Sequence, residues 1–322
     1  MKKALITGIN GQDGSYLSEF LLEKGYEVHG ILKRNSVAEN QTARLDGVFN
    51  KINLEYADML DLASLNRVLQ QVKPDEIYNL AAQSHVRISF DQPIYTTQVV
   101  AIGTLNILES MKLLCPNSRF YQASSSEMFG NSFDNDGFQR ETTPMHPTSP
   151  YGCAKVYGYN ITKNYRHSYN LFASNGILFN HESPRRGSNF VTNKVAKEAV
   201  RIKYGLTDKL MLGNLDATRD WGHAKDYVKC MWLILQQDTP DDFVCSTGIS
   251  HTVRELCEYV FGKLDLDYKD YVGVDQKYMR PEELTDLKGD SSKARWVLDW
   301  VHGYTFETML DEMVEHWDIV YG

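Results

Sequence analysis

Short apolar runs alternate with segments of helical periodicity along the first half of the chain. Six runs have the length and composition of strands, and they cover residues 4–7, 27–32, 52–56, 76–80, 120–123 and 173–178. Helical spacing of apolar positions predicts helices over 15–23, 62–71, 97–114 and 151–169. Strands that alternate with helices in this way form a parallel sheet covered on both faces. We therefore expect an α/β fold with a Rossmann-like, doubly wound parallel sheet.

The regular alternation weakens after about residue 180, where polar loops with clustered arginines separate shorter elements. We expect a larger domain over residues 1–180 and a smaller C-terminal lobe that covers mainly residues 181–322. Helical periodicity near 224–236 and a strand-like run at 243–245 indicate that part of segment 213–246 returns to the larger domain. In a final helix, Phe306, Leu310, Met313 and Trp317 share one face, which predicts a packing surface.

Composition narrows the range of partners and compartments. The 322 residues carry a net charge of −8, so we expect neither nucleic acid nor an anionic membrane as a partner. No apolar stretch approaches the roughly 18 residues of a membrane span, and the first apolar run ends at Gly8, too early for a secretory signal. Five cysteines without C-x-x-C spacing favour reduced thiols in the cytoplasm. The histidines show no metal-ligand spacing, so no metal is expected.

Three glycines, Gly8, Gly11 and Gly14, follow the first predicted strand and lead into a helix. The first glycine permits a tight turn, the second lets a pyrophosphate approach the backbone, and the third allows close packing of helix on strand. The helix N-terminus then offers amides and partial positive charge to phosphates. This context predicts a dinucleotide site in the larger domain, against the alternative of a plain glycine-rich turn.

The end of the second predicted strand indicates which dinucleotide fits. An acid there would accept hydrogen bonds from the adenosine ribose of NAD, but this chain has Lys33 and Arg34. Arg34 can meet a 2′-phosphate with a planar fork, which favours NADP. The alternative is a pair of solvated charges. Asp58 is a candidate for contact with the adenine ring, and small Ala81 and Ala82 would let the cofactor cross the sheet edge.

Tyr151 and Lys155 lie four residues apart on a predicted helix and therefore share one face. A nearby ammonium favours the phenolate, so Tyr151 could remove or return the proton of a hydroxyl group, while Lys155 could also hold the nicotinamide ribose. The same spacing recurs at Tyr159 and Tyr259, so spacing alone is weak evidence. Tyr151 is favoured because it follows Pro150 at the expected helix start, and Tyr159 is expected to be a packing residue.

Ser124, Ser125, Ser126 and Glu127 leave the fifth predicted strand at its carboxyl end, where ligands bind in open α/β sheets. Ser125 could hydrogen-bond a hydroxyl that is being oxidised. Glu127 would stand beside the substrate, or it would be a solvated loop glutamate. A simple alcohol dehydrogenase has no use for this carboxylate.

Longer runs resemble one family closely, the GDP-mannose 4,6-dehydratases of the extended short-chain dehydrogenase/reductase group. The similar runs are 7–17, 79–86, 120–124, 149–151, 175–187, 213–216 and 219–227, and they extend over nearly the whole chain. The resemblance implies that GDP-D-mannose becomes GDP-4-dehydro-6-deoxy-D-mannose plus water. Bound NADP+ would take hydride from C4, C5 would lose a proton, water would leave C6, and the hydride would return to C6.

The resemblance also implies roles for individual residues. The catalytic set is Ser125, Glu127, Tyr151 and Lys155, with Glu127 as the base at C5. The residues expected to bind the cofactor are Gly8, Asn10, Gly11, Gln12, Asp13, Arg34, Asp58, Met59, Leu80, Ala81, Ala82, Gln83, Ser84, Tyr95, Lys155, His181 and Arg186. The substrate would meet Ser84, Asn180, Asn189, Lys194, Arg219, Arg280 and Glu283. Arginines focused in this way let an acidic protein bind a diphosphate.

Three departures from the family pattern stand out. Ser125 occupies a position where the family usually has threonine, segment 131–141 is longer and more polar, and segment 35–41 differs where family members make a tetramer contact. We expect a homo-oligomer, either a dimer or a tetramer. A GDP-heptose substrate, an epimerase or 4-reductase of the same fold, and a catalytically silent dinucleotide sensor stay open as alternatives.

Overall fold

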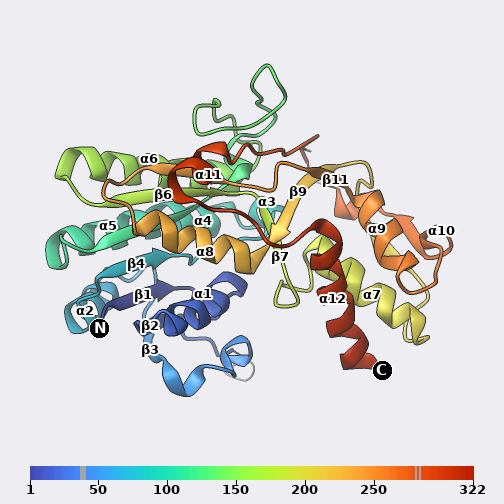
Figure 1. Ribbon diagram of the computed structural model, residues 1–322, viewed down its shortest axis with the longest axis horizontal. Coiled ribbons are helices and arrows are strands. Elements are labelled where there is room, and N and C mark those ends of the chain that lie inside the picture. Colours follow the sequence, from blue (N-terminus) through green and yellow to red (C-terminus); the bar gives the residue numbers. More distant parts are fainter. Residues whose placement is uncertain (37–40, 280, 283) are drawn as a thin grey trace.

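The computed structural model describes residues 1–36, 41–279, 281–282 and 284–322. Its centre is a parallel seven-stranded sheet in the order β10-β6-β5-β4-β1-β2-β3 (Figure 1). The strands are β1 (Lys3–Thr7), β2 (Glu27–Leu32), β3 (Asn53–Tyr56), β4 (Glu76–Asn79), β5 (Arg119–Ser125), β6 (Ala173–Leu178) and β10 (Asp242–Cys245). The strand order reverses between β1 and β4, and ligands of open α/β sheets bind at such a reversal.

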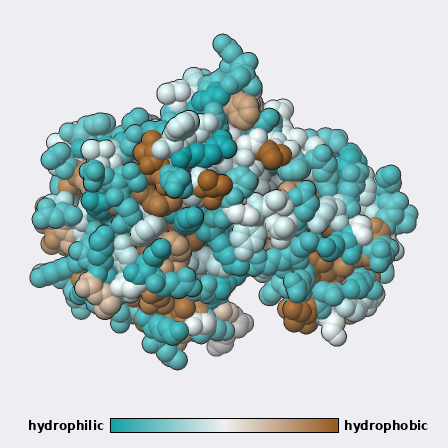
Figure 2. Space-filling model, viewed as in Figure 1, coloured by the Kyte–Doolittle hydropathy of each residue, from teal (hydrophilic) through white to brown (hydrophobic). Residues whose placement is uncertain are grey.

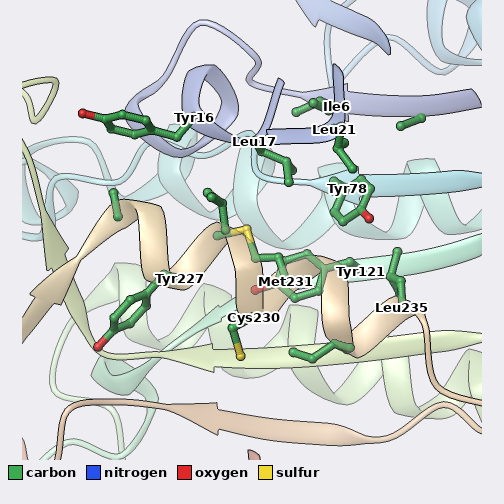
Figure 3. Close-up of a cluster of buried hydrophobic side chains, with 14 of the residues drawn as sticks. Ile6, Tyr16, Leu17, Leu21, Tyr78, Tyr121, Tyr227, Cys230, Met231 and Leu235 are labelled. Carbon is green, nitrogen blue, oxygen red and sulfur yellow. The ribbon is translucent and has the colours of Figure 1, made fainter. Parts of the chain in front are cut away.

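Helices cover both faces of this sheet, as the sequence pattern predicts. One face carries α1 (Gln12–Glu23), α8 (Ala224–Leu235) and α11 (Ser292–Leu298). The other carries α2 (Leu62–Val72), α5 (Gly103–Leu114) and α6 (Pro150–Tyr169). In Figure 3, Leu17 and Leu21 of α1 and Met231 of α8 gather with Tyr78 and Tyr121 of the sheet. Burial of these apolar faces is the main source of stability for such layers.

A second group of elements packs beside the carboxyl ends of the strands. It contains α7 (Val191–Lys203), α9 (Val253–Gly262), α10 (Tyr268–Tyr271), α12 (Phe306–Tyr321) and the paired strands β8 (Leu210–Leu212) and β12 (Val272–Val274). These elements share a separate apolar core, to which Phe306, Leu310 and Met313 of α12 contribute as their spacing predicts. Figure 2 shows a notch between the larger body at left and this smaller one at right.

Short elements connect the two bodies. A three-stranded sheet joins β7 (Asn180–Glu182) to β9 (Thr218–His223) and β11 (Ser250–Thr252).

Two short helices, α3 (Val86–Asp91) and α4 (Pro93–Thr97), precede a π-helical turn at Gln98–Ile102, and α5 follows it. The helix expected over 97–114 is therefore interrupted near its start. Further 3-10 turns lie at Ala43–Leu45, Phe49–Lys51, Ser126–Met128 and Gln276–Tyr278.

The cysteines differ in part from the expectation of reduced thiols. Cys230 of α8 and Cys245 of β10 form a disulfide, because α8 packs directly against the sheet edge at β10. Cys115, Cys153 and Cys257 are free. Within the described ranges, no helix is long and apolar enough to cross a membrane, and no three potential metal-ligating side chains gather.

Candidate active site

A cavity of about 870 Å³ lies at the carboxyl ends of β1, β4, β5 and β6, where the sheet faces the smaller body. A volume of this size suits a small-molecule ligand. The glycine turn, the end of β5 and the start of α6 line one side, and α7, β9 and Tyr278 line the other. Segments far apart in the sequence thus converge on one hollow.

The glycine turn forms a close-fitting cradle against the end of β4. Gly8 has φ +68°, and a Cβ there would lie 3.0 Å from Ala81 Cα. A Cβ on Gly14 would lie 2.5 Å from the Gly8 carbonyl oxygen, so neither position accepts a side chain. No side chain caps the N-terminus of α1 at Gly11, which leaves this end of the helix for an anion. These residues fit a dinucleotide pyrophosphate.

Asp13 and His181 form an ion pair beside this cradle. His181 Nε2 lies 2.8 Å from Asp13 Oδ2, and His181 Nδ1 lies 2.7 Å from the Phe179 carbonyl oxygen. Because both partners only accept hydrogen bonds, both ring nitrogens carry protons and the ring is an imidazolium. Burial alone would raise the pKa of Asp13, but His181 and its other partners lower that pKa to about 2. Burial would lower the pKa of His181, and Asp13 raises it.

Several of the expected cofactor residues lie near the end of β2 and do not line the cavity. Lys33 Nζ lies 3.1 Å from Asp58 Oδ2 and donates to the Tyr95 hydroxyl over 3.0 Å. Arg34 is exposed and donates to the Asn35 carbonyl oxygen. Lys33 therefore ties together two expected cofactor residues beside Arg34, a link that the sequence does not signal because the partners are distant along the chain.

Tyr151 and Lys155 are both buried on the first turns of α6 and line the cavity. The helix begins as expected, with Pro150 at its first position and the Ser149 side chain accepting a hydrogen bond from Gly152 N. Burial lowers the pKa of Lys155 to about 8, and its Nζ donates to the Ala123 carbonyl oxygen over 2.6 Å. Burial raises the pKa of Tyr151, although a hydrogen bond with Ser125 opposes that shift. The groups that lower the pKa of Tyr151 are Ser125 and Arg186, so the structure does not show the expected stabilisation of the phenolate by Lys155.

Ser125 stands between the tyrosine and the glutamate. Its hydroxyl interacts with the Tyr151 side chain and accepts a hydrogen bond from Glu127 N over 3.2 Å. Glu127 lies in the 3-10 turn after β5, is 5% exposed and lines the cavity, so it is not a solvated loop residue. The negative charge of Glu127 also raises the pKa of Tyr151. Two proton-transfer groups thus face one cavity.

The residues expected to meet the substrate lie on the opposite wall. The side-chain oxygen of Asn180 is buried and has no hydrogen-bond partner among the described residues, so it can accept one from a ligand. Lys194 Nζ donates to the Met211 carbonyl oxygen and lies 3.8 Å from the Tyr278 ring centroid. Arg219, which is buried, donates to the carbonyl oxygens of Thr218 and Leu284. Both Arg280 and Glu283 lie outside the described residues.

Most of the expected site residues converge on the cavity. Those that line it are Gly8, Asn10, Gly11, Gln12, Asp13, Leu80, Ala81, Ala82, Ser84, Ser125, Glu127, Tyr151, Lys155, Asn180, His181, Arg186, Asn189, Lys194 and Arg219. Met59 instead lies against Gly103, and the Gln83 side chain forms hydrogen bonds with His85 and Thr96. The cavity also includes Lys197, Phe190 and Tyr278, which lie in segments without a recognisable motif.

Tyr159, which shares the spacing of Tyr151, has a different environment. It is buried in an apolar cluster with Phe179 and Val244, and its hydroxyl donates to Asp242 Oδ2 over 3.2 Å. Tyr159 is therefore a packing residue, as expected.

Comparison with known proteins identifies the family. Residues 5–313 match the sequence profile of the GDP-mannose 4,6 dehydratase family. GDP-mannose 4,6 dehydratase 2 of Arabidopsis thaliana is 53% identical over 98% of this chain and 86% of its own length. GDP-mannose 4,6-dehydratase of Yersinia enterocolitica is 49% identical over 98% of this chain and 93% of its own length.

Solved structures share the fold. The UDP-glucose 4-epimerase of Thermotoga maritima with UDP-glucose superposes with a TM-score of 0.87 at 23% identity, over 99% of this chain and 100% of that one. RMD from Pseudomonas aeruginosa complexed with NADPH gives a TM-score of 0.82 at 21% identity, over 99% and 100%. These likenesses confirm the Rossmann-like α/β fold alone, whereas the profile and the close relatives confirm the resemblance seen in the sequence. The chain belongs to the GDP-mannose 4,6-dehydratase family.

Proposed function

We propose that this protein converts GDP-D-mannose to GDP-4-dehydro-6-deoxy-D-mannose and water. The observation that carries the proposal is that two groups able to transfer protons, Tyr151 and Glu127, line one cavity, with the charge of Glu127 close enough to raise the pKa of Tyr151. One proton-transfer group is enough to oxidise an alcohol. Loss of water from a sugar needs a second group that removes a proton from carbon, and Glu127 supplies it.

In the proposed chemistry, Tyr151 acts in the oxidation at C4 and Glu127 acts in the elimination of water. NADP, when bound, supplies the acceptor for the hydride of C4 and later the donor for C6. Tyr151 takes the proton of the C4 hydroxyl, and Ser125 hydrogen-bonds that oxygen. The C4 ketone acidifies the C5 hydrogen, which Glu127 removes as a proton and passes to the departing C6 hydroxyl, so that water leaves. After C6 has been reduced, a proton from solvent completes C5. Both groups are buried, so their side chains face the cavity and not the outer surface of the protein.

The opposite wall of the cavity suits a nucleoside diphosphate sugar. Arg219 and Lys194 bring positive charge to it, and arginine binds phosphate oxygens with charge-assisted hydrogen bonds. Asn180 offers its unpartnered oxygen to a hydroxyl or amide donor. Each of these contacts orients the sugar relative to Tyr151 and Glu127, which is how binding groups contribute to the reaction rate.

Replacement of Glu127 tests the proposal and separates it from the epimerase alternative. Glu127→Gln keeps the shape of the side chain but cannot remove the C5 proton. We expect this variant to reduce its bound nicotinamide when GDP-mannose is added, while dehydrated product falls at least about 100-fold. The readouts are the near-ultraviolet absorbance of reduced nicotinamide and the mass of the sugar nucleotide.

A matched control is Glu198→Gln, which alters a carboxylate on α7 that lines the same cavity and pairs with Arg201. The control should keep dehydration within about threefold of the unchanged protein. Full dehydration by Glu127→Gln would remove Glu127 from the mechanism. Conversion of GDP-mannose to its 4-epimer would instead favour an epimerase.

NADP rather than NAD is the proposed cofactor, because Arg34 is exposed at the end of β2 and no acid stands at that position. We expect Arg34→Gln to weaken NADP+ binding by about tenfold or more, since a charged hydrogen bond to phosphate contributes about 1.5–3 kcal/mol. NAD+ binding should stay unchanged. Calorimetric titration of both dinucleotides measures the difference, with Arg295→Gln on α11 as the control. Equal losses for both dinucleotides would contradict a 2′-phosphate contact.

A further inference from the structure

Asp242, at the start of β10, is a buried carboxylate that no step of the proposed reaction uses. It is 4% exposed and accepts hydrogen bonds from three side chains. Arg166 Nη2 and Asn175 Nδ2 donate to its Oδ1, the latter over 2.8 Å, and the Tyr159 hydroxyl donates to its Oδ2 over 3.2 Å. Burial would raise the pKa of Asp242, but Arg166 and its other partners lower it, so the group is charged.

One arm of this network reaches the helix that carries Tyr151 and Lys155. Tyr159 follows Lys155 by four residues and Tyr151 by eight, so all three lie on one face of α6. Arg166 lies two turns further along the same helix and also donates to the Ala173 carbonyl oxygen over 2.6 Å. The single carboxylate of Asp242 therefore holds α6 at two points against the edge of the sheet.

The other arm reaches the strand that carries Ser125. Because a carboxylate only accepts hydrogen bonds, Asp242 fixes the amide of Asn175 with its nitrogen toward β10. The Asn175 oxygen is then turned toward β5, where it accepts a hydrogen bond from Ser124 Oγ over 3.1 Å. Ser124 stands between Ser125 and Ala123, whose carbonyl oxygen accepts the Lys155 hydrogen bond.

We propose that Asp242 is a positioning residue that sets the spacing between Tyr151 and Lys155 on α6 and Ser125 on β5. The idea rests on the catalytic roles proposed above for those three residues. Buried ion pairs contribute little net stability in general but can fix one arrangement of the groups around them. Displacement of reacting groups by about 1 Å already slows a reaction strongly. A network that fixes α6 relative to β5 therefore affects the rate.

The test compares Asp242→Asn with a matched buried carboxylate. Glu76 is 1% exposed and accepts from Lys2, Tyr26 and Tyr78, but it lies at the amino end of β4, away from the cavity. Both Asp242→Asn and Glu76→Gln should lower the melting temperature. Only Asp242→Asn should lower kcat for GDP-mannose, by about 10- to 100-fold, with KM within about threefold. Equal kcat in the two variants would overturn the proposal.

An exchange of the two side chains gives a stricter test. Asn175→Asp combined with Asp242→Asn puts the carboxylate on β6, where it can accept hydrogen bonds from Ser124 and from the new amide at position 242. We expect each single variant to lose activity and the exchange to recover at least about tenfold of kcat, since neighbouring residues in one network are not additive. Losses that simply multiply would contradict a shared network.

Two further measurements keep the outcome clear if a variant folds poorly or the substrate assignment is wrong. Tyr159→Phe removes one hydroxyl, keeps the packing, and should lower kcat by about threefold to tenfold. Crystal structures of Tyr159→Phe and Asp242→Asn should show α6 displaced from the end of β5, whatever the substrate. An unmoved α6 in both would reject the positioning role. Absence of GDP-mannose turnover by the unchanged protein, with α6 displaced in the variants, would reject only the proposed function.

Discussion

Among single residues, Lys155 shows that burial in the site disfavours the charged form of a side chain proposed to act there. The side chain is 4% exposed, and burial lowers its pKa from 10.5 to about 8. Between these two values the unfolded chain keeps the proton and the folded chain releases it, so this residue makes stability rise with pH across that window. Below about pH 8 the folded protein holds a buried ammonium at a cost in stability.

Lys155→Met should therefore stabilise the cofactor-free protein while it removes activity. We expect the free energy of unfolding to rise by about 2 kcal/mol near pH 7, and this gain should shrink toward about pH 10. Denaturant unfolding of both proteins at the two pH values measures the difference. A gain that did not change with pH, or a loss near pH 7, would contradict the account of Lys155.

The sequence points to the proposed catalytic residues because they adjoin strong local signals. Tyr151 follows a helix start with Pro150, and Ser125 and Glu127 follow a buried strand, so the sheet topology brings them together. Asp242 carries no such signal, and the sequence does not indicate the contacts of Lys33 with Asp58 and Tyr95. Their partners lie on other strands and helices, and only folding reveals the hydrogen bonds that give them a role.

At the scale of elements, strands β2 and β6 have the bounds that the apolar runs predict, and the other predicted strands differ by one or two residues at an end. Buried parallel strands are easy to find because they carry apolar runs, although β2 also contains Glu27 and His29 and β6 contains Ser174 and Asn175. Helices α3 and α4 are too short to show helical periodicity, and helix α1 begins at Gln12 because the glycine turn itself opens the helix. In the smaller body, the apolar face of the final helix α12 is predicted by its spacing, whereas the other elements depend on tertiary packing.

The first turn of α6 must lie close to the turn that carries Glu127. A Cβ on Gly152 would lie 2.8 Å from the Glu127 carbonyl oxygen and 2.8 Å from Pro147 Cβ. Alanine normally stabilises a helix relative to glycine by about 1 kcal/mol. At this position we expect Gly152→Ala to push α6 and Glu127 apart, to lower kcat by about tenfold and to give no gain in stability.

Gly262 in α9 is the matched control, because nothing lies within 4 Å of a Cβ built there. Gly262→Ala should leave kcat unchanged and raise the melting temperature slightly. Steady-state kinetics and calorimetry on both variants measure these effects. A stabilised, fully active Gly152→Ala would show that the contact between α6 and the Glu127 turn does not limit the reaction.

At the scale of the whole molecule, the cavity is built from segments between Gly8 and Tyr278, and its two walls belong to separate apolar cores. Strand β10 pairs with β6 in the large sheet, and helix α8 packs on that sheet. The Ser183 hydroxyl also donates a hydrogen bond to the side-chain oxygen of Gln12, which links the segment after β7 to the start of α1. The division at residue 180, the homo-oligomer and the cytoplasmic location stay predictions.

Turnover of GDP-mannose by the purified protein in deuterated water tests directly whether the protein dehydrates this sugar nucleotide through loss of the C5 proton. We expect a product that has lost one water and carries solvent deuterium at C5, because the proton that Glu127 removes is replaced by one from solvent. Mass spectrometry and proton spectra of the product report both changes. An unchanged hexose, a 4-epimer, or a dehydrated product with its original C5 hydrogen would contradict the account.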